Sequence, residues 1–393
     1  MSRPRPAPVS ATAGFPSERA RRGMPGWRAV LTALVLILAA TAAAVVIDTP
    51  SGASNSSPAA GRATADARAF LRTYVEPSGR VVRRDQGATT VSEGQAYGLL
   101  LAQAAGEPTT FRHIWSWTRA HLLQPSGELS YLTDAAGTVT DATPASDADV
   151  LTAWALSRAT GPGAAAYHAQ ARRTAAAVLA NETVTQGRRL LLTAGPWATG
   201  SPASLDPSYW EPTAFAALAR FTGDRRWSTL AASAHDATAS LTGGGATLPP
   251  DWARLDGVAV SPTPAPNHQA PQVQYGLDAQ RLVVWMASSC SPGDRALAAQ
   301  WWRTLSAPQR SGAVALSPNG TVLDGQTNSL PYVAAAAAAG AGGNGRARAR
   351  LLARARKAQY RYPTYYGAAW LALGEALLET GELGGCAVQG GSS

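Results

Sequence analysis

Lysine is almost missing from this chain of 393 residues: Lys357 is the only one, and arginine carries nearly all of the positive charge. The formal net charge is +9, but residues 1–28 hold six arginines against one acid, so the rest of the chain is only mildly basic. Binding of nucleic acid needs a basic face on the folded domain. The charge distribution therefore argues against a nucleic-acid-binding protein.

Cysteine and histidine are also scarce. The two cysteines, Cys290 and Cys386, are too few for a disulfide framework, and the sequence leaves open whether they pair. The five histidines are scattered along the chain, which argues against a zinc site. A serine nucleophile elbow and a phosphate-binding glycine loop are missing from the sequence. We therefore expect neither a metal nor a cofactor.

The N-terminal region combines a basic tail, residues 1–28, with one long apolar run. Residues 29–47 are uncharged and mostly apolar, which is long enough for a helix to span a bilayer. Because the arginines precede this run, the tail is expected to stay in the cytoplasm. The run fits either a transmembrane anchor or the core of a secretory signal cleaved near Ala42–Ala44. Both interpretations place the rest of the chain outside the cytoplasm, as a membrane-anchored or a secreted protein.

The remainder of the chain is predicted to be helical. Residues 48–62 are rich in Ser, Ala, Pro and Gly and predict a flexible linker. Downstream, apolar periodicity and Gly/Pro-rich breaks predict twelve helices with little sign of strands. Because each amphipathic helix must bury one face, we expect one domain over residues 63–385 and a short tail over 386–393. The predicted helices start near Thr64, Glu93, Thr109, Asp147, Ala164, Pro212, Arg225, Gly276, Asp294, Ser329, Arg346 and Thr364.

The predicted helices alternate in character along the chain. The odd-numbered ones carry ordinary charged surfaces, as in "RARARLLARARKAQ", and the even-numbered ones are more uniformly apolar. This alternation predicts an all-α fold, an (α/α)6 barrel of six inner and six outer helices. The N-termini of the inner helices would share one rim. Polar and aromatic clusters begin these helices and would meet there: "SEGQAYG", "ASDADV", "DPSYWEP", "QYGLDAQR", "DGQTNSLPY" and "RYPTYYG".

Glu93, at the start of the second predicted helix, has two interpretations. Ser92 and Gln95 match a capping box, and an acid in the first turn suits the helix dipole. Capping does not explain Gly94, which weakens the helix and lets another group approach the backbone closely. A carboxyl group among apolar and aromatic side chains can instead hold a proton near neutral pH, as a general acid must.

Further charged residues begin two other inner helices. Asp147 and Asp149 exceed what one helix cap requires, so at least one of them is expected to face the rim. Asp278 and Arg281 have two interpretations. They form an ion pair on the surface, or Asp278 faces inward as a general base that Arg281 keeps ionised. The rim is also rich in Tyr and Trp, whose flat faces suit pyranose rings. Carboxylates on separate helices, one protonated and one ionised, fit glycoside hydrolysis.

The motifs "SEGQAYG", "FRHIWSWTRAHL", "ASDADVLTAWAL", "DPSYWEP", "LPPDW", "LDAQR" and "YYGAAWLALG" resemble glycoside hydrolase family 8, in this order, over residues 72–378. The similarity is greatest to the bacterial endo-β-1,4-glucanases that accompany cellulose synthases, which implies a cellulose-type substrate and a neighbouring polysaccharide synthase as partner. The resemblance also implies an (α/α)6 barrel and hydrolysis with inversion at the anomeric carbon, without metal or cofactor. Other members of the family act on chitosan, xylan or mixed-linkage β-glucan, so a chitosanase, xylanase or licheninase is the alternative.

The resemblance also implies roles for individual residues. Glu93 matches the general acid, Asp278 the general base, and Asp147 the acid that holds the sugar at the cleavage point. Some branches of the family place the base at another position. The predicted substrate-binding residues are Asp149, Arg281, Tyr97, Tyr209, Trp210, Tyr275 and Tyr366.

The chain departs from the family pattern at Leu277, Trp210 and Gly367, which leaves the substrate preference open. A glycan-binding wall-assembly protein without catalytic activity is the alternative outside enzymes. The three intact carboxylates favour an enzyme.

Overall fold

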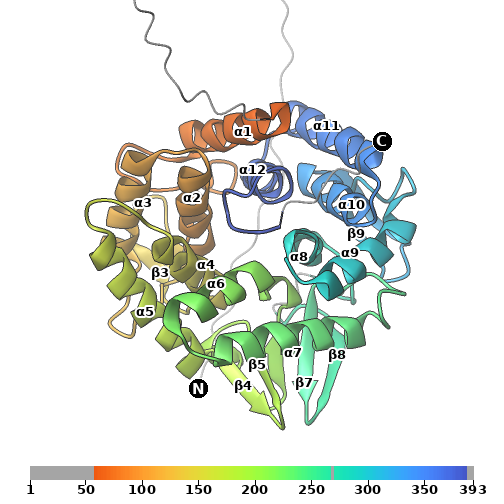
Figure 1. The fold of residues 1–393 in the computed structure, drawn as a ribbon, viewed down its shortest axis with the longest axis horizontal. Coiled ribbons are helices and arrows are strands. Elements are labelled where there is room, and N and C mark those ends of the chain that lie inside the picture. The colour runs from red at the N-terminus through yellow and green to blue at the C-terminus, as the bar shows by residue number, and fades with distance from the viewer. Residues whose placement is uncertain (1–56, 267–269, 387–393) are drawn as a thin grey trace, which may run out of the picture. The chain divides into compact units, whose positions relative to one another are not determined.

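The computed structural model describes residues 57–266 and 270–386. Twelve α-helices dominate these residues (Figure 1). They are α1 (Pro58–Tyr74), α2 (Ser92–Ala104), α3 (Pro108–His121), α4 (Ser146–Ser157), α5 (Ala164–Asn181), α6 (Pro212–Thr222), α7 (Arg226–Leu241), α8 (Leu277–Ser288), α9 (Pro292–Leu305), α10 (Ser329–Ala341), α11 (Gly345–Arg361) and α12 (Tyr365–Glu379).

Eleven of the twelve helices begin within two residues of the predicted start, and α1 begins six residues earlier, at Pro58. Ser57 caps α1 by accepting a hydrogen bond from the Ala60 N–H, and Pro58 suits the first helical position. The prediction of a flexible linker is therefore wrong for residues 58–62. The rest of that predicted linker up to residue 56, the basic tail and the apolar run lie outside the described residues.

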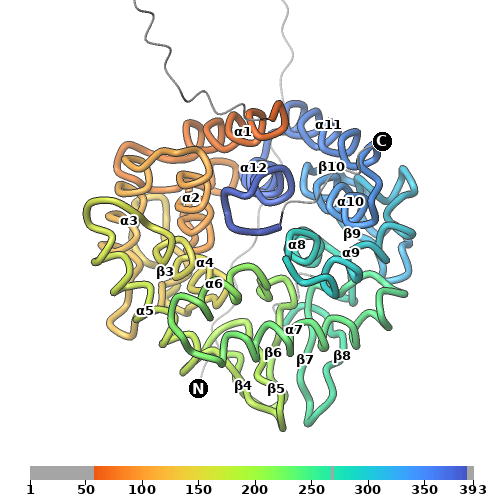
Figure 2. The backbone as a smooth tube through the Cα atoms, in the orientation of Figure 1, coloured from red at the N-terminus to blue at the C-terminus, as the bar shows by residue number. Residues whose placement is uncertain are grey.

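The helices form two concentric rings. Along the inner ring each even-numbered helix contacts the next one, from α2 to α12, and α12 contacts α2, so that the ring closes. Outside it, α3, α5, α7, α9 and α11 each pack on the preceding inner helix, and α1 packs on α12. The backbone trace in Figure 2 follows the chain once around the ring. This arrangement is consistent with the predicted (α/α)6 barrel.

Composition explains which helices are inside. The inner helix α10 has a run of fully buried alanines, residues 334–339. Gly374 of α12 allows α10 to approach closely, since a Cβ added at Gly374 would lie 2.2 Å from Val333 Cγ1. Small side chains let the inner helices pack tightly. The outer helix α11 buries only one stripe: Ala347, Leu351, Leu352, Ala355 and Ala358.

In the described residues ten short strands also lie between the helices, although the sequence shows little sign of them. They pair into four small sheets, β1–β2–β3, β4–β5, β6–β7–β8 and β9–β10. With two to six residues each, they are too short to show a clear alternation. Several of these strands, such as β1 before α2 and β10 before α10, lead into the start of an inner helix. The strands are β1 (Thr90–Val91), β2 (Leu132–Thr133), β3 (Val139–Asp141), β4 (Thr183–Gln186), β5 (Arg189–Leu192), β6 (Ala203–Leu205), β7 (Trp252–Asp256), β8 (Ala259–Thr263), β9 (Ala313–Leu316) and β10 (Val322–Thr327), with 3-10 turns η1 (Pro196–Ala198) and η2 (Pro207–Tyr209).

Cys290 and Cys386 form a disulfide bond, which settles the pairing that the sequence leaves open. The bond joins the chain just after α8 to the segment that follows α12. Over the part of the chain that the structure describes, no helix is both long and apolar enough to cross a membrane.

Candidate active site

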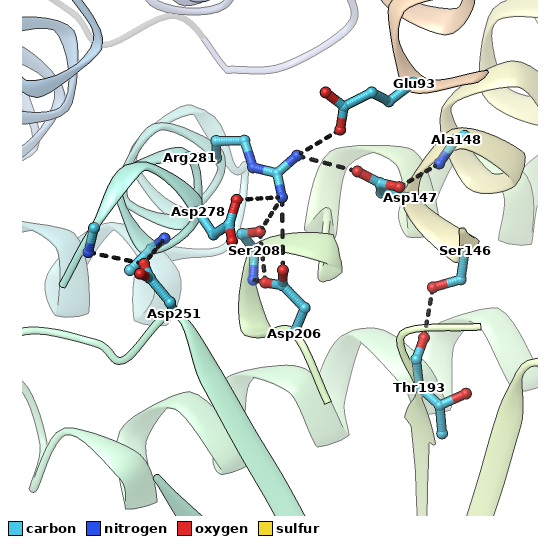
Figure 3. Close-up of polar contacts among 12 residues, drawn as sticks. Glu93, Ser146, Asp147, Ala148, Thr193, Asp206, Ser208, Asp251, Asp278 and Arg281 are labelled. Atoms are coloured by element: carbon cyan, nitrogen blue, oxygen red, sulfur yellow. Dashed lines mark hydrogen bonds and ion pairs between the residues drawn. The ribbon is translucent and has the colours of Figure 1, made fainter. Parts of the chain in front are cut away.

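Arg281 of α8 lies at the centre of the candidate site (Figure 3). Its Nη1 donates to Asp147 Oδ2 at 3.0 Å and to Glu93 Oε2 at 3.3 Å. Its Nη2 donates to Asp278 Oδ1 at 3.4 Å and lies 3.7 Å from Asp206 Oδ2. One guanidinium therefore faces four carboxyl groups, which come from α2, α4, α8 and the residue before η2.

Uncharged groups fix the guanidinium in this position. Tyr97 Oη accepts a hydrogen bond from Nη1 at 3.1 Å, and Ser208 Oγ accepts one from Nη2 at 2.6 Å. The ring of Tyr209 lies 5.3 Å from the guanidinium carbon, a cation–π distance. With only 3% of its side chain exposed, Arg281 is a fixed internal cation.

One cation cannot neutralise four carboxylates in a buried site, so some of them are expected to hold protons. Burial raises the pKa of Glu93 to about 8; the charge of Asp147 adds to this shift, and Arg281 opposes it. A hydrogen bond between the two carboxyl groups raises the pKa of Glu93 and lowers that of Asp147, although burial keeps the pKa of Asp147 above its ordinary value. Burial and the facing carboxyl group of Asp147 therefore favour a protonated Glu93. Glu93 can thus supply a proton at neutral pH.

The two remaining carboxyl groups differ in their access to water. Asp206 is 1% exposed, and burial, with the nearby charge of Asp278, raises its pKa well above the ordinary value. The side chain of Asp278 is 38% exposed, the largest fraction among the four acids, and it also contacts Arg281. Asp278 is therefore the one of the four acids that a water molecule can most easily reach, as the base of an inverting site requires.

The separation of Glu93 and Asp278 is limited by the arginine that both of them contact. Because both carboxylates lie within hydrogen-bond distance of one planar guanidinium, their contacting oxygens are at most about 9 Å apart. Inverting glycosidases hold their acid and base ~6.5–9.5 Å apart, which leaves room for a water molecule. The upper limit set by Arg281 is compatible with that spacing.

The capping box expected from Ser92 and Gln95 is wrong, although Glu93 does lie in the first turn of α2. Among the described residues, no side chain caps α2, and the Ser92 hydroxyl is buried without a partner. Gln95 Oε1 instead accepts a hydrogen bond from the Val81 N–H, and its Nε2 donates to Thr118 Oγ1 at 2.7 Å. Long-range contacts thus replace the local capping box.

Gly94 permits a close approach, as the sequence predicts. An added Cβ would lie 2.2 Å from Tyr365 Oη, so the group that approaches is a tyrosine of α12. Gly367 is also required by space, since its Cβ would lie 2.6 Å from both Ser329 Oγ and Gln359 Oε1. The family departure at Gly367 is therefore explained by packing.

Asp149 does not reach the rim. It is fully buried, its Oδ1 accepts a hydrogen bond from the Leu129 N–H at 2.8 Å, and burial, with the nearby charge of Glu182, raises its pKa well above the ordinary value. Asp147 faces the rim, as expected for at least one of the pair, whereas Asp149 points into the protein. The prediction that Asp149 binds substrate is wrong, because α4 turns its side chain toward the outer layer.

Three predicted substrate-contacting aromatic residues are also buried. Tyr97 is fully buried against Arg281, Trp210 is fully buried and donates from Nε1 to the Leu192 carbonyl, and Tyr275 is 1% exposed. These positions contradict direct contact with a substrate. Arg281 is likewise held by protein carboxylates. Tyr209 and Tyr366 remain partly exposed, and their contact with sugar stays a prediction, as does the sugar-holding role of Asp147.

Sequence reasoning missed three residues of the site. Asp206 and Ser208 belong to "DPSYWEP", and Asp251 belongs to "LPPDW". Both motifs lie in connections between helices, so no helical periodicity marks them. A signal did exist, because each acid lies directly beside a proline: Asp206 precedes Pro207, and Asp251 follows Pro249 and Pro250. No cluster of His, Cys, Asp and Glu in the described ranges is arranged to hold a metal ion.

A carboxyl group that holds a proton and a second one open to water form the pair that glycoside hydrolases use. The sequence profile of the glycosyl hydrolases family 8 matches residues 39–366. The chain belongs to this family of glycosidases.

Individual relatives agree with this assignment. A probable endoglucanase of Novacetimonas hansenii is 26% identical over 261 residues, which cover 63% of this chain and 74% of that protein. An endoglucanase of Cellulomonas uda is 30% identical over 195 residues, which cover 47% of this chain and 54% of the relative. The structure of the endo-beta-1,4-glucanase CMCax from Acetobacter xylinum matches with a TM-score of 0.66 and 23% identity over 80% of this chain and 97% of that one. At this identity the structural match supports the fold.

Proposed function

We propose that the chain is an endo-acting glycosidase that cleaves β-1,4-linked glucan of the cellulose type with inversion at the anomeric carbon. The observation that carries the proposal is the pair of carboxyl groups, Glu93 and Asp278, held on opposite nitrogens of the Arg281 guanidinium. The relatives named endoglucanase support the choice of substrate.

The two carboxyl groups would act together in one displacement. Glu93 donates its proton to the glycosidic oxygen as the bond to the anomeric carbon breaks. Asp278 accepts a proton from the water that attacks the opposite face of the sugar, so the product has the inverted configuration. Glu93 is then ionised and Asp278 protonated, and exchange with solvent restores both groups. Arg281 contacts both carboxyl groups and so limits how far apart they lie.

We further propose that the domain works outside the cytoplasm. The Cys290–Cys386 disulfide supports this location, because disulfides persist mainly in oxidising compartments. The apolar run predicted at residues 29–47 would serve as a membrane anchor or as a cleaved signal. A membrane-anchored domain could then act on glucan as a neighbouring polysaccharide synthase releases it.

Reducing-end release by the full-length protein in detergent tests the proposed activity. The substrates are carboxymethylcellulose, mixed-linkage glucan, xylan and chitosan, and NMR of the fresh product reports the anomeric configuration. We expect release from carboxymethylcellulose, and a loss of about 10²–10⁴-fold in Glu93→Gln. The matched control is Glu107→Gln, which removes a partly exposed acid away from the rim and should leave the activity unchanged.

The remaining outcomes select the alternatives. Release from chitosan or xylan alone would replace the glucanase by the corresponding enzyme of the same family. Folded protein that releases no sugar from any of the four polymers would refute hydrolysis and favour a glycan-binding protein. Retained configuration in the product would refute the roles of Glu93 and Asp278.

A further inference from the structure

The helix that carries the general base has no capping side chain of its own. Helix α8 begins at Leu277, its N-cap residue is Gly276, and no side chain in that position caps it. The first turn of a helix leaves N–H groups without partners inside the helix. Asp278 lies in this first turn, so the position of its carboxylate depends on how the turn is held.

Asp251 caps this turn from a different part of the chain (Figure 3). Its Oδ1 accepts hydrogen bonds from the Gly276 N–H at 2.8 Å and from the Ala279 N–H at 2.9 Å. Its Oδ2 accepts one from Gln274 Nε2 at 2.9 Å, and its own N–H donates to the Gln274 carbonyl at 2.8 Å. One residue thus makes four hydrogen bonds to the segment that ends in α8.

Gly276 is matched to this carboxylate. An added Cβ at Gly276 would lie 2.4 Å from Asp251 Oδ2, so any larger residue would push the carboxylate away. The φ angle of Gly276 is −108°, which all residues can adopt, so space is the reason for glycine. The contact between Asp251 and the α8 turn therefore requires both residues.

Asp251 is itself anchored to a sheet. The next residue begins β7, the middle strand of β6–β7–β8, in which Ala253 pairs with Leu205 of β6. On the other side, Tyr275 exchanges two backbone hydrogen bonds with Leu316. The segment before α8 is thus held between the β6–β7–β8 sheet and strand β9. Strand β6 of the first sheet leads directly to Asp206 of the site.

We propose that Asp251 is a positioning residue for the general base: by capping α8 from the β7 side, it holds Asp278 at the spacing from Glu93 that inversion requires. The inference rests on the proposed glycosidase activity. Asp251 is 8% exposed, and its hydrogen bonds go to the first turn of α8 and the segment before it, so it acts through α8. Burial, with the nearby charge of Asp278, raises the pKa of Asp251 to about 7, in agreement with their proximity.

The loss of a positioning residue should affect turnover more than substrate binding. We expect Asp251→Ala to lower kcat at least tenfold and to change KM less than twofold. Asp251→Asn keeps an oxygen for the two amide groups and should retain kcat within threefold of the wild type. The matched control is Asp224→Ala: Asp224 Oδ1 caps the outer helix α7 through the Arg226 N–H at 2.9 Å, and its loss should leave kcat unchanged.

An activated substrate distinguishes base positioning from a general structural defect. A dinitrophenyl β-cello-oligosaccharide needs little protonation of its leaving group, so Glu93→Gln should recover most of its activity on it. A defect in the general base should lower kcat on the activated substrate as well. Asp251→Ala should therefore show the same fold decrease in kcat on both substrates. Folded Asp251→Ala with wild-type kcat, or a loss that the activated substrate relieves, would overturn the proposal.

Gly276→Ala gives an independent test if Asp251→Ala fails to fold. The added methyl group displaces the carboxylate while Asp251 remains, so the same fall in kcat with unchanged KM is expected. Wild-type turnover in Gly276→Ala would refute the proposal. An inactive wild-type protein would instead refute the proposed function, which separates the two failures.

Discussion

Arg281 Nη1 lies 3.3 Å from Glu93 Oε2, although 188 residues separate the two in the chain. This contact joins the first turn of α2 to α8 across the inner ring. Because Asp147 shares the same nitrogen, the charge on one carboxyl group affects the proton on the other. Arg281 therefore affects the protonation of Glu93 and, through its second nitrogen, also contacts the carboxylate of Asp278.

The pH dependence of kcat/KM is the first consequence. Burial raises the pKa of Glu93 to about 8, and a general acid works only in its protonated form, which is populated below that pH. We expect kcat/KM on carboxymethylcellulose to fall tenfold for each pH unit well above 8. Initial rates between pH 6 and 10 check this, with stability measured at each pH. A decline that already begins near pH 5 would contradict the raised pKa.

Arg281→Met should destabilise the protein in a pH-dependent way. The change leaves Asp147 and Asp206, each 1% exposed, without their cation, and breaking a buried ion pair costs about 3–5 kcal/mol. Without the arginine the folded-state pKa values of these acids rise further, so the folded protein binds more protons than the unfolded chain. Stability then falls as pH rises. Arg281→Met should therefore lose more unfolding free energy, relative to the wild type, at pH 8 than at pH 5.

Urea unfolding of Arg281→Met at the two pH values measures this difference. Arg226→Met is the matched control, because Arg226 forms an exposed pair with Asp224, whose loss should cost less than about 1 kcal/mol. Equal destabilisation of Arg281→Met at both pH values would show that lost packing, and not charge, dominates.

Local patterns predicted the helices and the rim residues that lie on them. The periodicity of apolar residues placed the helix starts, and inner helices with a common direction brought Glu93 and Asp278 to one end. The same patterns could not identify Asp206 or Asp251, because their partners lie far away in the sequence and their own connections have no period. The capping box at Ser92 failed for a related reason: Val81 and Thr118 compete for Gln95, and a local motif cannot show this competition.

Gly94→Ala should strain the turn behind Glu93. The new methyl group would lie 2.2 Å from Tyr365 Oη, and overpacking a well-packed interior costs about 1–3 kcal/mol. Tyr365→Phe removes the clashing hydroxyl, which has no hydrogen-bond partner among the described residues. We therefore expect the double variant to be more stable than Gly94→Ala in thermal unfolding. No recovery in the double variant would place the strain elsewhere in α2.

A second buried acid group should make stability depend on pH. Glu182 is fully buried beside Asp149, and burial, with the charge of Glu128, raises the pKa of Glu182 to about 8. The folded state therefore binds a proton that the unfolded chain releases near pH 4.5, and stability falls as pH rises from about 4.5 to 8. The slope is at most about 1.4 kcal/mol per pH unit for this group.

Glu182→Gln removes this dependence, so its stability relative to the wild type should be greater at pH 8 than at pH 5. Urea unfolding at both values measures the difference. Glu107→Gln, at a partly exposed acid, is the control and should show no such change. The same stability difference from the wild type at both pH values would show that Glu182 is not protonated in the folded protein.

The disulfide between Cys290 and Cys386 should contribute strongly to stability. It closes a loop with a sequence separation of 96 residues, and the chain-entropy model assigns ~4.7 kcal/mol to a loop of about 100 residues. The bond also ties the segment after α12 to α8, where the Cys386 N–H donates to the Ser288 carbonyl at 3.0 Å. Cys290→Ser/Cys386→Ser should therefore have a lower Tm than the wild type. Reductant should lower the wild-type Tm by a similar amount and leave the double variant unchanged. Two titratable thiols in the native protein, isolated from an oxidising compartment, would show that the bond does not form there.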